Sequence, residues 1–379
     1  LGRDEDIRTA LKVNKRIMQL RSATENGISV LPYEEVDKNH HDVNRLPMYG
    51  MDRWADVFTD RQLLALHCFR VALKRGLVKG HYSKEAALLL ALAVDRLADY
   101  GSSVCRWVPR GEYMGNSFGR QALQMVWDFA EVNPFSGSTG DFAGALDWIT
   151  QVVEREALSL YHKGSVAQAN ATSHSLPDDA ASAFVTDPPY FDAIDYGVIS
   201  DFFYVWLRRT IASVYPELFL DDETPKSEQV VVNANTTKGT GTRDEKFFRS
   251  AMMKAMAEGR RVTTPDGIGV VVFAHKSTAG WESQLASMLE AGWIITASWP
   301  IDTEMGERLV ARGSAALSSS IHLVCRPREN SDGTVRNDEI GDWRDILQEL
   351  PGRIHNWMRP GNYCRFRFTD GRADQIGDT

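Results

Sequence analysis

Four consecutive residues, Asp187-Pro188-Pro189-Tyr190, have the side chains and backbone needed to hold an amine. They follow the apolar run 183–185, which predicts a buried strand that stops at the prolines, because proline cannot donate a ladder hydrogen bond. The end of the strand then presents a carboxylate, two free carbonyls and an aromatic ring. An exocyclic amine would donate to Asp187 and to the Pro188 carbonyl, and its ring would stack on Tyr190. The turn therefore predicts chemistry on a base taken out of its stack.

Two pairs of polar residues could complete this site. Asp192 and Tyr196 follow the turn and could line its pocket, and they could equally be helix-entry residues. His275 and Lys276 follow the apolar run 267–274, where the carboxyl edge of a doubly wound sheet would place them near a ligand. The alternative for this second pair is a polar loop end. We interpret all four as candidate substrate-binding residues.

Apolar periodicity predicts a mainly helical first region of the chain. Thr59 and Gln62 have the spacing of a capping box at the start of one of its helices. Phe202 and Trp206, in a later helix rich in aromatic residues, are expected to pack in a core rather than stack on a base. The helices expected in the first region cover residues 1–22, 58–74, 84–100, 118–129 and 142–156.

The pattern changes after about residue 160, where short apolar runs alternate with helical segments. This alternation predicts an α/β fold with a mostly parallel, doubly wound sheet. The last two strands are expected to be antiparallel, because the segment between them shows no clear crossover helix. The expected strands cover residues 165–169, 183–186, 267–274, 293–298 and 320–325. The expected helices cover residues 199–214, 245–261 and 280–291, with a helix pair within 343–357.

We therefore divide the chain into three regions. Residues 1–160 form a mainly helical region that either recognises the target or covers the sheet. Residues 161–330 form the catalytic half that carries the Asp187–Tyr190 turn, and residues 331–379 form a helical tail.

Composition limits the class of protein. The chain has 379 residues, of which 43% are hydrophobic and 25% are charged, and this ordinary globular composition allows a sizeable core. The net charge of −8 excludes a global basic field, so nucleic-acid binding must rely on local patches. No segment approaches the ~18 apolar residues that span a membrane, no signal peptide is visible and the cysteines lack CxxC spacing. These observations predict a cytoplasmic location without membrane association.

Two adjacent histidines, His40 and His41, lie in the polar stretch 23–53. Imidazole is a common metal ligand. Adjacent histidines without a cluster of further ligands are usually loop residues, so the sequence predicts no metal site.

The chain resembles the C-terminal half of large adenine-specific DNA methylase-like proteins, some of which are associated with phage-defence islands. The resemblance covers most of the chain from about residue 50 to residue 330. Its central segments are FVTDPPYFDAIDYGVISDFFYVWLRR, VVVFAHKSTAGWESQLASMLEAGW, ASWPIDTEMGER and SSSIHLVCRPR. The earlier segments WADVFTDRQLLAL and MVWDFAEVNPF look similar to the same family.

This resemblance implies a Rossmann-like class I methyltransferase sheet of seven strands with an antiparallel last strand. It also implies S-adenosylmethionine as methyl donor and DNA as substrate, with adenine preferred over the N4 of cytosine. Asp187 and Pro188 would accept the N–H bonds of the amine, Pro189 would stiffen the turn, and Tyr190 would stack on the base. Methyl transfer to an amine needs no covalent intermediate, so positioning would supply much of the rate.

The sequence departs from the family at the cofactor loop. Family members carry an Asp-Pro-Phe-x-Gly-Gly-Gly-type loop upstream of the matched region, and the candidate here is NPFSGSTG at residues 133–140. Phe135 and Gly137 in this segment are the candidate cofactor-binding residues, and the alternative is a plain turn. The chain begins with Leu1, so an upstream portion is missing or the start codon is unusual. An N-terminal half or a second subunit could therefore carry the cofactor loop.

Two alternatives to a DNA methyltransferase remain open at this point. The same chemistry could act on RNA or on protein, and the acidic net charge is consistent with this. The chain could also be a truncated or partner subunit that binds DNA but lacks its own cofactor loop.

Overall fold

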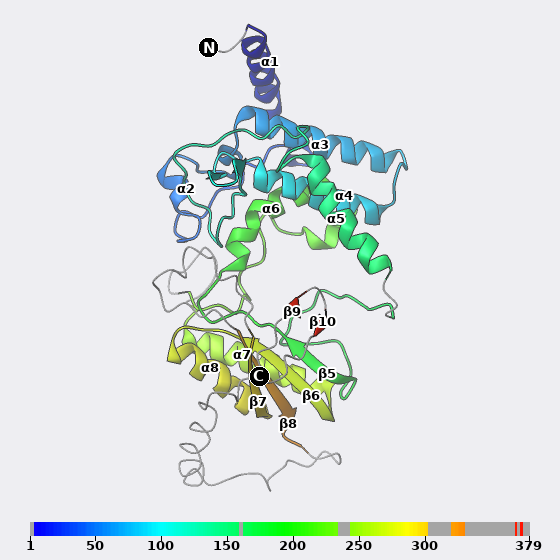
Figure 1. Cartoon of the computed structure of the whole chain (residues 1–379), viewed down its shortest axis with the longest axis vertical. Helices are drawn as coiled ribbons and strands as arrows, with labels where there is room; N and C mark the ends of the chain where they lie inside the picture. The colour runs from blue at the N-terminus through cyan, green and yellow to red at the C-terminus, as the bar shows by residue number, and fades with distance from the viewer. Residues whose placement is uncertain are drawn as a thin grey trace, which may run out of the picture. The chain divides into compact units, whose positions relative to one another are not determined.

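The computed structural model describes residues 4–158, 162–233, 243–301 and 320–329, together with two short strands, β9 (Phe368–Thr369) and β10 (Arg372–Ala373) (Figure 1). The described chain forms two compact units. The first, which we call the helical unit, contains the residues up to Ser165 and the segment Ile194–Gln229. The second, the sheet unit, contains Val166–Ala193, Val230–Asn233 and the described residues from Arg243 onward.

The helical unit is built from five longer helices. Helix α4 contacts three of the others, α3, α5 and α6, and helix α1 contacts α3. The predicted helices at 1–22, 58–74, 84–100 and 142–156 are confirmed, with small shifts of their ends. The longer helices are α1 (Asp4–Arg21), α3 (Asp60–Val78), α4 (Lys84–Tyr100), α5 (Phe142–Ala157) and α6 (Tyr196–Ile211). The short elements are β1 (Thr24–Glu25), β2 (Ile28–Ser29), α2 (Arg45–Met48), η1 (Trp54–Val57), β3 (Trp107–Val108), β4 (Tyr113–Met114) and η2 (Pro216–Leu218).

Aromatic side chains form the core of the helical unit. Phe202 and Trp206 on α6 are fully buried, as predicted for core residues. The ring of Phe58 stacks on Phe202 at 5.7 Å and meets the edge of Trp206 at 5.5 Å. The predicted capping box before α3 is also confirmed, because the backbone N–H of Gln62 donates to the Thr59 hydroxyl and that of Thr59 donates to the Gln62 side chain. Since α6 supplies part of this core, the helical unit takes in residues beyond the region 1–160.

The sheet unit contains a mixed four-stranded sheet with the strand order β5-β6-β8-β7. Its strands are β5 (Ala181–Thr186), β6 (Thr263–Phe273), β7 (Trp293–Ile301) and β8 (Ser320–Pro327). Strand β5 pairs with β6 in parallel, and β8 lies antiparallel between β6 and β7. Three strands therefore share a direction and the last one is reversed, so the predicted antiparallel pairing of the last two strands is confirmed.

Two helices, α7 (Glu245–Val262) and α8 (Thr278–Glu290), contact one another and the sheet. Every second residue of the central strand β6 is buried from Gly267 to Phe273, which is the period-two pattern of a sheet covered on one face. Phe184 of β5 stacks on Trp293 of β7 at 5.8 Å across the sheet. The apolar core of this unit is formed chiefly by Phe248, Met252, Met256, Val271, Met288, Trp293 and Leu323.

Several sequence-based expectations are wrong. Strand β5 is not buried as predicted, since none of its residues is buried and the Val185 side chain is 70% exposed. Residues 165–169 do not form a strand, and Val166 is fully exposed, so a strand there would bury nothing. Residues 118–129 do not form a helix: Phe118 and Leu123 pack in the core of the unit, whereas Trp127 is 97% exposed. The sheet is not mostly parallel in its pairings, since only β5 and β6 pair in parallel. Among the described residues the sheet has four strands, with none of its strands before β5, in place of the seven implied.

The helix pair expected within residues 343–357 lies outside the described residues, as does most of the helical tail expected at 331–379. Among the helices that the structure describes, none is both long and apolar enough to cross a membrane.

Candidate functional site

The Asp187–Tyr190 turn lies at the carboxyl end of β5, as the sequence predicts. The last residue of the strand, Thr186, pairs with Val271, and the chain leaves the sheet at the following residue. Pro188 is buried whereas Asp187 is exposed, so the turn is held by its backbone and presents its carboxylate outward. Among the described residues, neither the Asp187 carboxylate nor the Pro188 carbonyl takes part in a hydrogen bond. Both acceptors are thus available to a donor from outside the described chain.

Phe191 anchors the turn to the sheet unit. Its φ of 47° lies in the left-handed region, which is unusual for a bulky residue and is tolerated only where packing fixes it. The buried ring makes edge contacts with Phe248 at 5.1 Å and with His275 at 5.3 Å. The Phe191 carbonyl accepts from the backbone N–H of Val232 at 2.8 Å. The sequence reasoning missed this anchor, because the local pattern shows no sign of a left-handed residue here.

The Tyr190 ring also contacts the sheet. The ring lies edge to face with that of Phe273, the last residue of β6, with the ring centroids 5.5 Å apart. The backbone carbonyl of Tyr190 accepts from the N–H of Ala193 at 2.8 Å, which closes the turn. The ring is partly exposed, so part of it is accessible to a stacking partner while the contact with Phe273 restricts its motion.

Asp192 and His275, which the sequence selected separately, are brought together. Their side chains meet at 2.8 Å, between Asp192 Oδ1 and His275 Nε2. The backbone N–H of Ser277 donates to His275 Nδ1 at 3.2 Å, so Nδ1 is the acceptor and Nε2 carries the proton donated to Asp192. The contact ties the segment after β5 to the segment after β6. This hydrogen bond therefore restricts the position of the Asp187–Tyr190 turn.

Ser277 has a second role as the N-cap of α8, since its hydroxyl accepts from the N–H of Gly280 at 3.2 Å. The sequence signal for this role was available, because serine directly before a helix is a common N-cap. Lys276, the neighbour of His275, is exposed at the same edge.

Replacing Gly280 by alanine is expected to break the contact between Asp192 and His275. A Cβ atom at this position would clash with His275 Nδ1, so the ring must move. Overpacking of this kind costs about 1–3 kcal/mol of unfolding free energy. Urea unfolding would measure the loss, and the imidazole signals in an NMR spectrum would report the displacement. Thr278→Ala, an exposed change in the same turn, is the control. Unchanged His275 signals in Gly280→Ala would contradict the expectation.

The other three candidate residues belong to the helical unit. Tyr196 is the first residue of α6 and is 53% exposed. Phe135 and Gly137 lie in the turn 133–140, directly before α5. The Phe135 side chain is 78% exposed and its ring lies 5.4 Å from that of Phe69.

The turn 133–140 has little free donor capacity. Gly137, with φ of 70°, donates its N–H to Asp141 Oδ2 at 2.9 Å, and Phe135 donates its N–H to Asn133 Oδ1 at 3.0 Å. Ser136 and Ser138 also donate their backbone N–H groups within the turn. No strand of the described chain precedes this turn directly, so the strand–loop–helix context of a nucleotide-type cofactor loop is missing. These features favour the alternative of a plain turn, and the cofactor contacts of Phe135 and Gly137 stay a prediction.

The chain is an α/β protein with a mixed sheet, in which strand β5 ends at a turn containing two prolines. No model of a known protein family matches the sequence. No curated protein matches it either. A solved structure from Thermus thermophilus, provisionally described as a DNA modification methylase, aligns with 50% of this chain and 63% of its own length at 14% identity. The TM-score of that alignment is 0.23, so the similarity does not establish a shared fold.

Proposed function

We propose that this chain holds the base-binding part of an S-adenosylmethionine-dependent DNA methyltransferase with a Rossmann-like class I sheet. The reaction proposed is methyl transfer to the exocyclic amine of a flipped base, adenine in preference to cytosine. One observation carries the proposal. The turn Asp187–Tyr190 follows strand β5 and presents two acceptors, the Asp187 carboxylate and the Pro188 carbonyl, to which no described residue donates. The packing of Tyr190 and Phe191 against the sheet unit holds the turn in place. The resemblance of the flanking segments to adenine-specific DNA methylase-like proteins supports the same assignment.

The proposed part of the turn is to hold and prepare the amine. Asp187 and the carbonyl of Pro188 accept one N–H bond each, which favours a nitrogen whose lone pair is no longer delocalised into the ring. Tyr190 stacks on the base, and Pro189 limits the motion of the backbone. Asp187 is also placed to receive the proton that the nitrogen gives up once it is methylated. Positioning and charge of this kind account for a large share of many enzymatic rates.

The remaining candidate residues keep separate proposed roles. Asp192 and His275 position the turn through their hydrogen bond, and Lys276 and Tyr196 are proposed contacts to the nucleic acid. S-adenosylmethionine would supply a methyl group on a positively charged sulfur, which an amine can attack directly. Phe135 and Gly137 remain the proposed cofactor contacts from the sequence alone, and the occupied donors of their turn do not favour them.

A second candidate function is that of a partner subunit, which binds the target but methylates nothing alone. Two observations favour it: the described sheet has no strand before β5, and the turn 133–140 lacks the context of a cofactor loop. A second chain, or an N-terminal half of the same protein, would then supply the cofactor loop.

Methyl transfer by the purified chain tests these proposals. Tritiated S-adenosylmethionine would be incubated with the chain and unmodified genomic DNA, and with RNA and protein in parallel. Label in N6-methyladenine is the expected result, and label in RNA or protein would select the alternative substrates. Calorimetric binding of the cofactor separates the two candidate functions. A chain that binds DNA but not the cofactor would be the partner subunit, and one that binds neither would overturn both proposals.

A further inference from the structure

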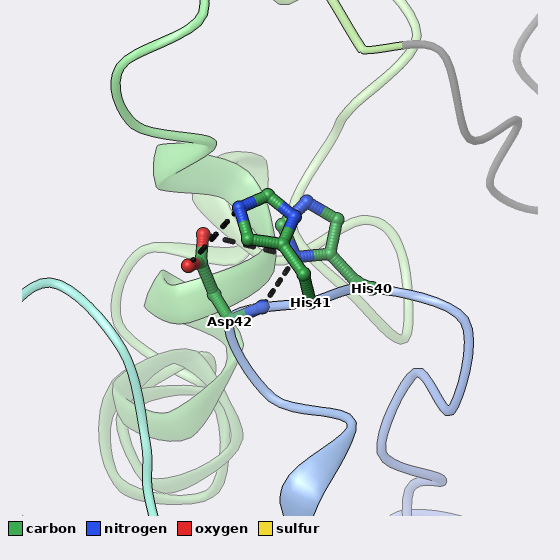
Figure 2. A group of neighbouring side chains, drawn as sticks. All are labelled: His40, His41 and Asp42. Carbon is green, nitrogen blue, oxygen red and sulfur yellow. Dashed lines mark hydrogen bonds and ion pairs between the residues drawn. The ribbon is translucent and has the colours of Figure 1, made fainter.

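A cluster of titratable side chains lies in the helical unit, apart from the Asp187–Tyr190 turn. Figure 2 shows His40, His41 and Asp42 on one loop, with their polar atoms close together. One ligand atom from each of the three residues can be chosen so that all lie within 4.8 Å of one another. His40 is completely buried, the Asp42 side chain is 13% exposed and the His41 side chain is 67% exposed. The cluster is thus closed at one end and open to solvent at the other.

The distances within the cluster suit ligands of one metal ion. His41 Nε2 lies 3.3 Å from Asp42 Oδ1, and His40 Nδ1 lies 3.8 Å from Asp42 Oδ2. Metal–nitrogen and metal–oxygen bonds of about 2.0–2.1 Å in a tetrahedral zinc site separate neighbouring ligand atoms by about 3.3 Å. The rings of His40 and His41 stack with centroids 4.7 Å apart, which restricts both rings. Small rotations would therefore bring the three ligand atoms around one ion.

A carboxylate lies near the second ring nitrogen of His40, as is common for histidines that bind a metal. The Nδ1 atom of His40 accepts from the backbone N–H of Asp42 at 3.3 Å, so Nδ1 is the nitrogen with the lone pair, and coordination through Nδ1 would replace this long hydrogen bond. Its Nε2 lies 3.3 Å from Oδ2 of Asp195, a buried carboxylate at the N-cap of α6, and makes no hydrogen bond to another described residue, so a small rotation of the ring would let it donate to Asp195. A carboxylate on the far nitrogen fixes the tautomer of a ligating histidine and raises its basicity. The local sequence shows no sign of this partner, because Asp195 is distant along the chain.

Charge favours a cation in the same place. The Asp42 side chain is 13% exposed, and its carboxylate lies 3.8 Å from His40 and 3.3 Å from His41. A carboxylate at low exposure is costly unless it is paired or coordinates a cation. A cation bound by Asp42 would offset part of this cost.

We propose that His40, His41 and Asp42 bind a divalent transition-metal ion of the zinc type, with Asp195 orienting His40. Two imidazoles and a carboxylate form a ligand set of the kind zinc accepts, and they leave a fourth position open on the exposed side. All three ligands lie on one loop, and the approach of Asp195 to His40 connects this loop to the start of α6. This site is independent of the proposed methyl transfer.

Metal binding to the full chain tests the proposal. The chain would be stripped with a chelator, dialysed and titrated with Zn²⁺ against a chromophoric competitor. The expected result is one ion per chain, with cobalt giving the visible absorption bands of a four-coordinate nitrogen–oxygen site. His41→Ala, at the exposed ligand, is expected to weaken zinc binding by more than about 100-fold without unfolding the chain, because second-sphere changes alone cost 10–100-fold.

Two further variants separate a ligand from a structural residue. Asp195→Asn is expected to weaken zinc binding by about 10–100-fold while the cobalt bands persist, since all three ligands remain. His81→Ala, an exposed histidine outside the cluster, is the matched control and should bind zinc as the parent does. The proposal is overturned if the parent chain binds no zinc, or if His41→Ala and Asp42→Ala bind it as tightly as the parent. Circular dichroism would confirm that each variant is folded.

Discussion

Replacing Asp187 by alanine is expected to lower the rate of methyl transfer to DNA by about 10²–10³-fold, the usual effect of removing one preorganised polar group from a transition state. The variant keeps the Pro188 carbonyl and the Tyr190 ring, so DNA binding should change much less than the rate. Because Asp187 is exposed and no described residue bonds to it, the fold should not be affected. Label transfer from tritiated S-adenosylmethionine to DNA, per mole of folded chain, measures the effect.

Two controls make this result specific. Asp187→Asn keeps an acceptor oxygen without the charge, so its rate should lie between those of the parent and the alanine variant. Asp266→Ala removes another exposed carboxylate of the sheet unit, nearer the opposite end of the parallel strands, and should have the parental rate. Parental activity in Asp187→Ala would show that the turn is not the site of the reaction.

Replacing Arg209 by alanine is expected to cost about 3–5 kcal/mol of unfolding free energy, a large part of the total stability of an ordinary domain. The Arg209 side chain is 2% exposed and donates to Glu34 and to the carbonyls of Ser29, Leu31 and Val205. Burial lowers the pKa of this guanidinium, and the carboxylate of Glu34 opposes that shift. Removing the guanidinium leaves the Glu34 carboxylate and the carbonyls of Ser29 and Leu31 without this buried donor.

An exposed arginine of the same unit provides the control for this prediction. Arg61 pairs at 2.7 Å with Glu131 and its side chain is 60% exposed, so Arg61→Ala should cost about 1 kcal/mol or less. Urea unfolding followed by tryptophan fluorescence would measure both variants, since Trp54 and Trp206 are buried in the same unit. Equal losses in the two variants would contradict the role given to Arg209.

The sequence predicted best what depends on neighbours along the chain. Strand β5 and its end could be predicted because the two prolines stop any ladder, whatever lies around them. Helix α4 could be predicted with its bounds, because a serine N-cap precedes a continuous run of helix-forming residues. The capping box of α3 depends on Thr59 and Gln62 alone, and it was found for the same reason.

Contacts between distant segments could not be predicted in this way. Residues 118–129 have helical composition, yet Leu123 is buried with its N–H bonded to the carbonyl of Asp42, and Phe118 packs on Phe202. These partners outweigh a weak local preference for helix. The pairing of Asp192 with His275 and the approach of Asp195 to His40 have the same origin, since each joins residues far apart in the chain.

The position of α6 in the chain has a consequence for the order of folding during synthesis. Phe202 and Trp206 complete the core of the helical unit, but they are translated after strand β5 of the sheet unit. Helices α1, α3, α4 and α5 therefore emerge from the ribosome before their apolar core is complete. The missing part of the core is on α6, which is synthesised only after strand β5 of the sheet unit. Strand β5 in turn has no pairing partner until β6 is synthesised, later still. Neither unit can fold to completion before the other has begun to appear, so the nascent chain is exposed to chaperones for longer than two consecutive domains would be.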